Sequence, residues 1–109
     1  MAAVFEALAA PRRREILRLV WDRERSAGDI RRAHPDVSFG AISQHLRVLE
    51  SAGLLERRDE GRFHYYAARR KALGHLGKWL ESMWDEALSE LKQHAESEEK
   101  RRGRRRGRS

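Results

Sequence analysis

The sequence contains no cysteine and only two prolines among its 109 residues. Without a thiol it can form neither a disulfide nor a thiolate metal site, and nothing in it indicates an oxidising compartment. No apolar run approaches the roughly 18 residues that a membrane-spanning helix needs. The first ten residues, MAAVFEALAA, lack the basic region and long apolar core of a secretory signal. We therefore expect one small cytoplasmic domain that makes no contact with a membrane.

Recognisable catalytic patterns are also missing. There is no glycine-rich phosphate loop and no pair of carboxylates in an evident pocket, and none of the five histidines has a partner at motif spacing. The sequence therefore predicts a protein that is not an enzyme and that uses no cofactor.

Charge is abundant and unevenly distributed along the chain. Residues 1–80 carry 16 basic and 10 acidic side chains, residues 81–99 carry one basic and seven acidic, and residues 100–109 carry seven basic and none acidic. The net charge of +7 thus equals that of the last ten residues alone. A basic front and an acidic back suit a protein that turns one face toward a polyanion, although charge runs are also typical of simple solvated faces.

The stretch from Ser26 to Ala67 organises the chain. Ser26 caps a short helix, with an acidic side chain three residues later, and His34-Pro35-Asp36 ends it. Ser38 caps a second helix that runs to Ala52, with Gly53 as its stop. This helix places Ile42, Leu46 and Leu49 on an apolar face, and Gly40, Ser43, Gln44 and Arg47 on the opposite surface.

A hairpin follows the second helix. Strands are expected over 54–58 and 62–66 around a turn at 59–61, with Phe63 and Tyr65 on one face and Arg62, His64 and Tyr66 on the other. Two short helices, a tight turn and a β-hairpin are typical of a winged helix-turn-helix, which places its second helix in the major groove of DNA. The expected fold is mostly α with a small β-hairpin: four helices, two strands and a final helix.

Helices also flank this stretch. A short helix over 2–9 presents Val4, Phe5 and Leu8 on one face, and the next helix is expected to bury Ile16, Leu17 and Val20. In the helix that Ser26 caps, Ile30 and Ala33 are the expected inward residues. The Arg12-Arg13-Arg14 run is either a phosphate contact or a solvated helix start. A long helix from Ala72 to about Ala95 carries an apolar stripe broad enough for a subunit interface, although its tryptophans could instead cap a monomer core. We expect a domain over 1–95 and a disordered Arg-rich tail over 96–109.

Three segments together resemble a known family. The segments FEALAAPRRREILRLV, ISQHLRVLESAGLLERR and EGRFHYYA look like those of the ArsR-type winged-helix transcriptional repressors of bacteria. The resemblance covers about residues 2–95. It implies a homodimeric repressor that binds double-stranded DNA at a palindromic operator, with the first and last helices forming the interface.

The resemblance also implies which residues act. The second helix, which Ser38 caps, corresponds to the recognition helix of the family, and the hairpin that follows it corresponds to the wing. The DNA contacts are expected at the start of the recognition helix and on the wing: Ser38, Phe39, Gly40, Ser43, Gln44, His45, Arg47, Arg57, Arg58 and Arg62. The dimer interface is expected to contain Val4, Phe5, Leu8, Leu76, Trp79, Leu80, Met83, Trp84, Leu88 and Leu91. Phe39-Gly40 departs from the polar pair of many relatives, which points to an apolar contact with a thymine methyl group. Gln44 is then the best direct reader, because its amide can bond adenine N6 and N7 together. His45 lies at the edge of the apolar face, where packing and DNA contact are both open.

Metal sensing, common in such repressors, is not expected. The family's cysteine site falls where this chain reads SAGDIRR, and the His-x-x-Glu pair of its second site fails because His94 is followed by Ala-Glu-Ser-Glu. A single histidine with Glu81, Asp85 and Glu86 is a poor zinc set. Any small-molecule effector is unknown.

Two other functions compete with a DNA-binding regulator. The chain could be a protein-interaction module that uses Trp79, Trp84 and the acidic residues 81–99. It could also be a non-specific nucleic-acid binder led by the basic tail.

Overall fold

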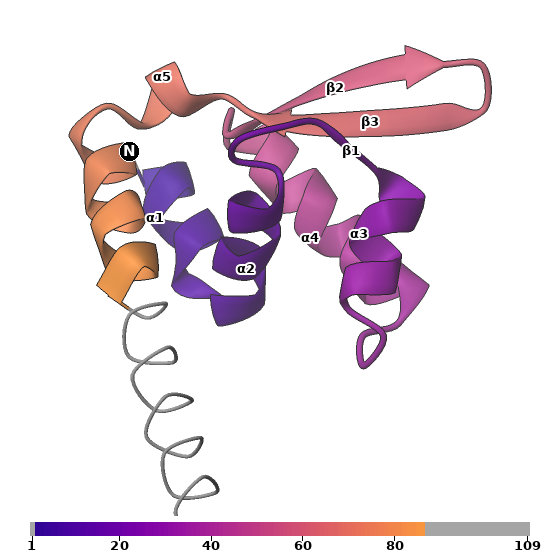
Figure 1. Cartoon of the computed structure of the whole chain (residues 1–109), viewed down its shortest axis with the longest axis horizontal. Helices are drawn as coiled ribbons and strands as arrows, with labels where there is room; N and C mark the ends of the chain where they lie inside the picture. Colours follow the sequence, from indigo (N-terminus) through magenta and orange to yellow (C-terminus); the bar gives the residue numbers. More distant parts are fainter. Residues whose placement is uncertain (1, 87–109) are drawn as a thin grey trace, which may run out of the picture. The chain divides into compact units, whose positions relative to one another are not determined.

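The computed structural model describes residues 2–86, and the chain divides into two compact units, residues 1–74 and 75–109. In the first unit the elements are α1 (Ala2–Ala9), α2 (Pro11–Leu19), β1 (Arg25–Ser26), α3 (Ala27–Ala33), α4 (Phe39–Ser51), β2 (Leu55–Glu60), β3 (Phe63–Ala68) and α5 (Arg70–Leu73). Figure 1 shows their arrangement within this unit. In the second unit, residues 75–86 are helical. The expected boundary at residues 95 and 96 lies outside the described residues.

The predicted caps are confirmed. The Ser26 side chain accepts a hydrogen bond from the Asp29 backbone N–H (3.1 Å), and Ser38 accepts one from Ala41 (3.2 Å). Each satisfies a donor that the first turn of a helix leaves unpaired. Gly53 has φ +78°, the left-handed conformation that ends α4.

The core of the first unit lies between its helices and the base of the sheet. α4 packs against α2 and α3, and the predicted apolar face of α4 is confirmed, since Ile42, Leu46 and Leu49 are buried. The predicted inner residues Ile16, Leu17, Val20 and Ile30 are buried as well. Ala33 is an error of prediction: it is exposed, because α3 has only seven residues and Ala33 is the last.

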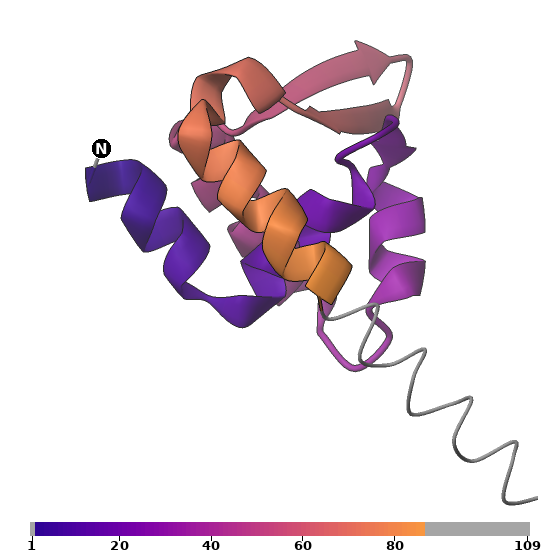
Figure 2. The same ribbon diagram turned by 60° about the vertical axis from the view of Figure 1, so that its left-hand side comes forward.

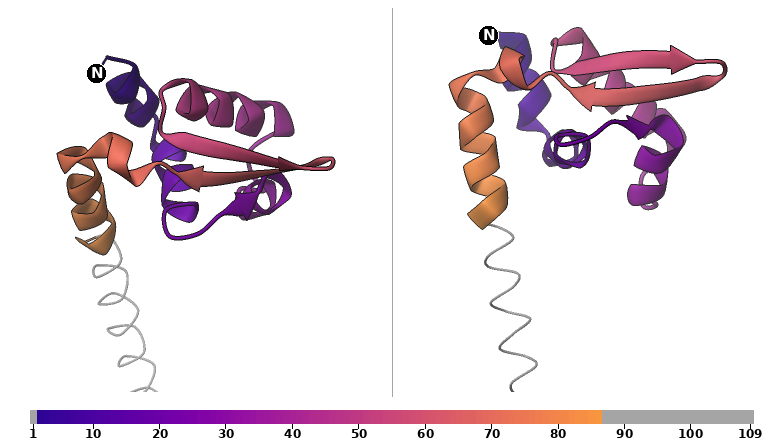
Figure 3. Two further views of the ribbon diagram at one scale, coloured as in Figure 1. Left: turned by 90° about the horizontal axis from the view of Figure 1, so that it is seen from above. Right: turned by 45° about the horizontal axis from the view of Figure 1, so that its top comes forward.

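The sheet has three strands rather than two. β1 pairs antiparallel with β3, which pairs antiparallel with β2, in the order β1-β3-β2. The turn also differs from the prediction, since Glu60 pairs with Phe63 and the loop is only Gly61-Arg62. Gly61 has φ +60°, as the first residue of a type II′ hairpin turn requires. Both views in Figure 3 show the β2–β3 hairpin reaching past the helices of its unit.

The last helix does not begin at Ala72 as predicted. α5 ends at Leu73, Gly74 breaks the helix with φ +52°, and a new helix starts at residue 75. Only glycine adopts such a φ readily, so an apolar pattern that continues across it is interrupted in the backbone.

Candidate nucleic-acid interface

The outer face of α4 presents the residues expected to face the bases. Ser38, Phe39, Gly40, Ser43, Gln44 and Arg47 are all exposed. Around Gly40, an added Cβ would meet no atom within 4 Å, so nothing inside the chain requires a glycine there. The first two turns of α4 therefore offer a surface of small, amide and aromatic groups with open space in front of it.

His45 lies behind that surface. It is half-buried, and its Nδ1 is 3.4 Å from Nη1 of Arg13 in α2. Burial, followed by the nearby Arg13 charge, lowers the pKa of His45. Of the two roles left open by the sequence, the geometry favours packing as a neutral ring against α2.

The arginine run has a role that the sequence did not suggest. Arg13 donates to the carbonyls of Ala7 (Nε, 2.5 Å) and Glu6 (2.9 Å), and Arg14 donates to those of Leu8 (2.7 Å) and Ala9 (3.3 Å). These are the last four residues of α1, whose carbonyls have no partner within the helix. Cations also suit a helix C-terminus. Figure 2 shows α1 and the bend after its C-terminal end, from which α2 begins.

Arg12 fixes the turn that precedes the recognition helix. It donates to both carboxylate oxygens of Asp36 (3.2 and 2.5 Å), which lowers the pKa of Asp36. It also lies 3.0 Å from Nδ1 of the buried His34 and 3.4 Å from Glu15. Because arginine only donates, Nδ1 of His34 accepts. Arg12 therefore ties α2 to the α3–α4 turn.

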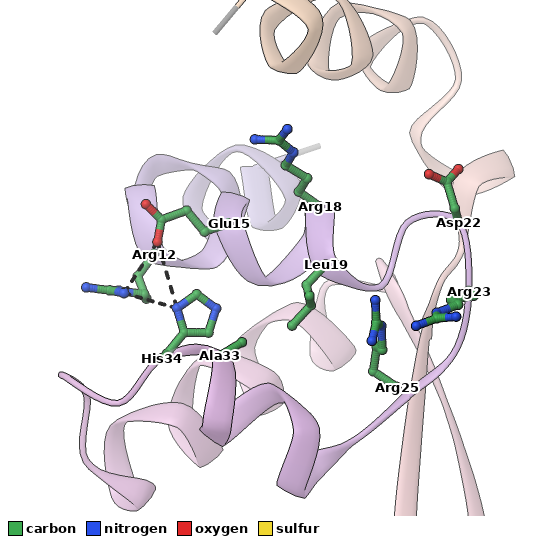
Figure 4. A pocket seen from close by; sticks show the side chains of 9 residues that line it. All are labelled: Arg12, Glu15, Arg18, Leu19, Asp22, Arg23, Arg25, Ala33 and His34. Carbon is green, nitrogen blue, oxygen red and sulfur yellow. Dashed lines mark hydrogen bonds and ion pairs between the residues drawn. The ribbon is translucent and has the colours of Figure 1, made fainter. Parts of the chain in front are cut away.

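An open cavity of about 650 Å³ lies beside this contact, lined by residues of α2, β1, α3 and the loop before β1. Figure 4 shows Arg12, Glu15 and His34 joined at one end, and Arg25 pointing toward Leu19. Nε of Arg25 is buried without a hydrogen-bond partner in the described part of the chain. None of the expected DNA contacts lines this cavity.

The three wing arginines differ in their surroundings. Arg58 bonds Glu24 (3.1 and 2.7 Å) and Glu60 (2.6 Å) and lies over the Tyr65 ring at 4.5 Å. The hydrogen bond to Glu24 is the main reason that the pKa of Arg58 is raised. Arg57 lies 3.2 Å from Asp59, whose other neighbour is His64 (2.7 Å). Arg62, at the exposed turn, has no ion-pair partner among residues 2–86.

One neighbour of the recognition helix was missed by the sequence analysis. The guanidinium carbon of Arg31, in α3, lies 4.6 Å from the centroid of the Phe39 ring. Phe39 is 68% exposed. The only sign of this contact in the sequence is the unusual phenylalanine at the start of the recognition helix.

The expected interface residues that the structure describes fall into three groups by their exposure. Phe5 and Trp79 are largely exposed, at 60% and 55%. Val4, Leu76, Met83 and Trp84 are half-buried, whereas Leu8 and Leu80 are already buried within a single chain. Leu88 and Leu91 lie outside the described residues, as do His94 and most of the acidic segment.

Within residues 2–86, no group of three or more histidine, aspartate or glutamate side chains is placed to hold a metal ion. The same part of the chain contains no helix long and apolar enough to cross a membrane.

A capped and exposed second helix beside a projecting hairpin defines a winged helix-turn-helix DNA-binding domain. Residues 10–57 match the family described as bacterial regulatory protein, arsR family. The transcriptional repressor SdpR of Bacillus subtilis (strain 168) is 35% identical over 80 residues, which cover 73% of this chain and 88% of that protein. The chain belongs to the ArsR family and is a transcriptional regulator.

Solved structures of similar sequence support the assignment to the ArsR family. A winged helix-turn-helix domain of Mb0332 from Mycobacterium bovis, described as homodimeric and as a possible ArsR-family regulator, is 34% identical with a TM-score of 0.66, and the match covers 80% of each chain. An ArsR-like transcriptional regulator from Rhodococcus sp. RHA1 is 37% identical with a TM-score of 0.63, covering 88% of this chain and 90% of that one. Of the three functions considered from the sequence, membership of a family of regulators supports the DNA-binding regulator.

Proposed function

We propose that the protein is a homodimeric repressor that reads a two-fold symmetric operator in the bacterial cytoplasm. Each protomer inserts α4 into the major groove, and the two recognition helices are about one helical turn of DNA apart. The observation that carries the proposal is the division of α4 into a buried apolar face and an exposed face of small, amide and aromatic groups.

Base recognition rests on two side chains of α4. Gln44 is exposed and can accept from adenine N6 and donate to N7 with its one amide. Phe39 offers an apolar surface for a thymine methyl group. Ser38, Gly40 and Ser43 line the same surface and allow the helix to approach closely.

Phosphate contacts position the domain without reading sequence. Arg47 on α4 and Arg62 at the wing turn are the best placed for this role, because both are exposed. Arg57 and Arg58 belong to the same surface, but their carboxylate partners already balance much of their charge. We assign Arg58 chiefly to holding the wing against the loop before β1, through Glu24.

Dimerisation is supported by exposed aromatic side chains and by the relatives. Phe5 and Trp79 leave apolar surface uncovered in a single chain, and such surface is typical of a subunit interface. The Mycobacterium bovis relative is described as homodimeric, and SdpR as a repressor. We therefore assign Phe5, Trp79 and the half-buried Val4, Leu76, Met83 and Trp84 to the interface.

Gln44→Ala tests base recognition. We expect the variant to lose about 1–3 kcal/mol of discrimination at one adenine of each half-site while it binds other sequences as before, because one bidentate contact is removed. The measurement is competition binding with operators that carry single base-pair changes. Ser51→Ala, at the exposed end of the same helix, is the matched control. Equal discrimination by Gln44→Ala and the wild type at every position would remove Gln44 from the recognition surface.

A further inference from the structure

Arg31 and Arg32 are adjacent in α3, but their surroundings differ. Arg32 forms an ion pair with Asp29 on the same helix. Arg31 has no carboxylate partner in the described part of the chain, and its guanidinium lies over the ring of Phe39. The charge of Arg31 is therefore available to an anion from outside the protein.

The ring that Arg31 covers is the first residue of the recognition helix. Phe39 is 68% exposed, so few of its own contacts restrict its rotamer. A guanidinium held against one face by cation–π attraction restricts it and leaves the other face and the edge open. Because α3 and α4 are joined by the turn that Arg12 ties to α2, the two side chains are held on a fixed frame.

The position of α3 indicates which anion is available. In a helix-turn-helix the first helix crosses the DNA backbone while the second enters the groove. A cation on α3 that leans over the start of α4 therefore lies between backbone and base edges. Arginine can stack on a ring while its N–H groups remain free to donate to phosphate oxygens.

We propose that Arg31 binds a DNA phosphate and, through its contact with the Phe39 ring, positions Phe39 against a thymine methyl group. Arg31 is thus a positioning residue for base recognition as well as a backbone contact. This inference rests on the proposed function, because it requires α4 to lie in the major groove.

The experiment uses the full chain and operator DNA in which each thymine is replaced in turn by uracil, which removes only the methyl group. We expect the wild type to prefer thymine at one position of each half-site by about fourfold, the value of one buried methyl group. Arg31→Ala should bring this preference close to one. It should also weaken the salt dependence, reducing the magnitude of the negative slope of log affinity against log salt by about one for each protomer.

Two further variants separate the roles. Phe39→Ser should lose the thymine preference but keep the salt slope, and adding Arg31→Ala to it should change the slope alone. Arg32→Ala, the matched control, should keep the thymine preference, because its guanidinium is paired with Asp29 and not with the ring. Circular dichroism of each variant checks that the fold is retained.

The outcomes are distinct. If Arg31→Ala keeps the thymine preference, the positioning role is wrong, and if it keeps the salt slope, the phosphate contact is wrong. A wild type that binds a specific site without any thymine preference also overturns the inference but leaves the proposed function intact. A wild type with no sequence preference overturns the proposed function itself.

Discussion

Trp79→Glu is expected to convert the dimer into a monomer and to lower operator affinity by about 10²- to 10⁴-fold, because the second half-site no longer benefits from linkage to the first. Trp79 is 55% exposed in a single chain, so a partner can cover its ring. A carboxylate at that position would have to be buried without a partner, which strongly disfavours association.

Analytical ultracentrifugation at micromolar concentration measures the change directly. Lys78→Glu is the matched control, since it introduces the same carboxylate at an exposed neighbouring position, on the opposite side of the helix from the apolar stripe. Trp79→Phe should retain the dimer, because it keeps an aromatic ring. A Trp79→Glu protein that sediments as a dimer would place the interface elsewhere.

Arg13→Ala is expected to lower the free energy of unfolding by about 1.5–3 kcal/mol, the range for hydrogen bonds that involve a charged group. The variant leaves the carbonyls of Glu6 and Ala7 without their guanidinium partner, and it removes the contact with His45. The eight-residue α1 is too short to be stable without such contacts. Denaturant unfolding at fixed protein concentration gives the value.

Arg18→Ala is the control for this experiment, because Arg18 is exposed on the same helix and contacts neither carbonyl. It should change stability by less than about 0.5 kcal/mol. The salt dependence of DNA binding should be the same for Arg13→Ala as for the wild type. If the slope of log affinity against log salt were shallower by about one for each protomer, Arg13 would be a phosphate contact and not a residue that stabilises α1.

Local signals in the sequence predicted most of the helix-turn-helix. Ser38 and Gly53 mark the ends of the recognition helix by their cap chemistry, and the spacing of Ile42, Leu46 and Leu49 identifies its buried face. These features depend on residues within a few positions of one another, which is why a single sequence is enough. The exposed position of Gln44 follows from the same periodicity.

Contacts between distant residues were not predictable in this way. β1 has two residues, too few for an alternating pattern, and its pairing with β3 joins positions about forty apart. Arg58 meets Glu24 across 34 positions, and the partners of Arg13 and Arg14 are backbone carbonyls, which leave no mark on the sequence. Arg31 and Phe39 lie on different helices, so only the angle between α3 and α4 brings them together.

The break at Gly74 was missed for another reason. The apolar periodicity continues on both sides of it, and a single glycine within such a pattern is compatible with a continuous helix. Only the backbone conformation, with φ +52°, shows that one helix ends there and another begins.

α4 is proposed to read a DNA sequence. The decisive measurement is an equilibrium titration of the full chain with the sequence that it enriches from a random DNA pool, and with unselected DNA of equal length at the same salt concentration. We predict binding to the enriched sequence that is at least about 10³-fold tighter, as specific sites typically show. Equal affinity for both DNAs would show that α4 does not read sequence and would identify the protein as a non-specific DNA binder.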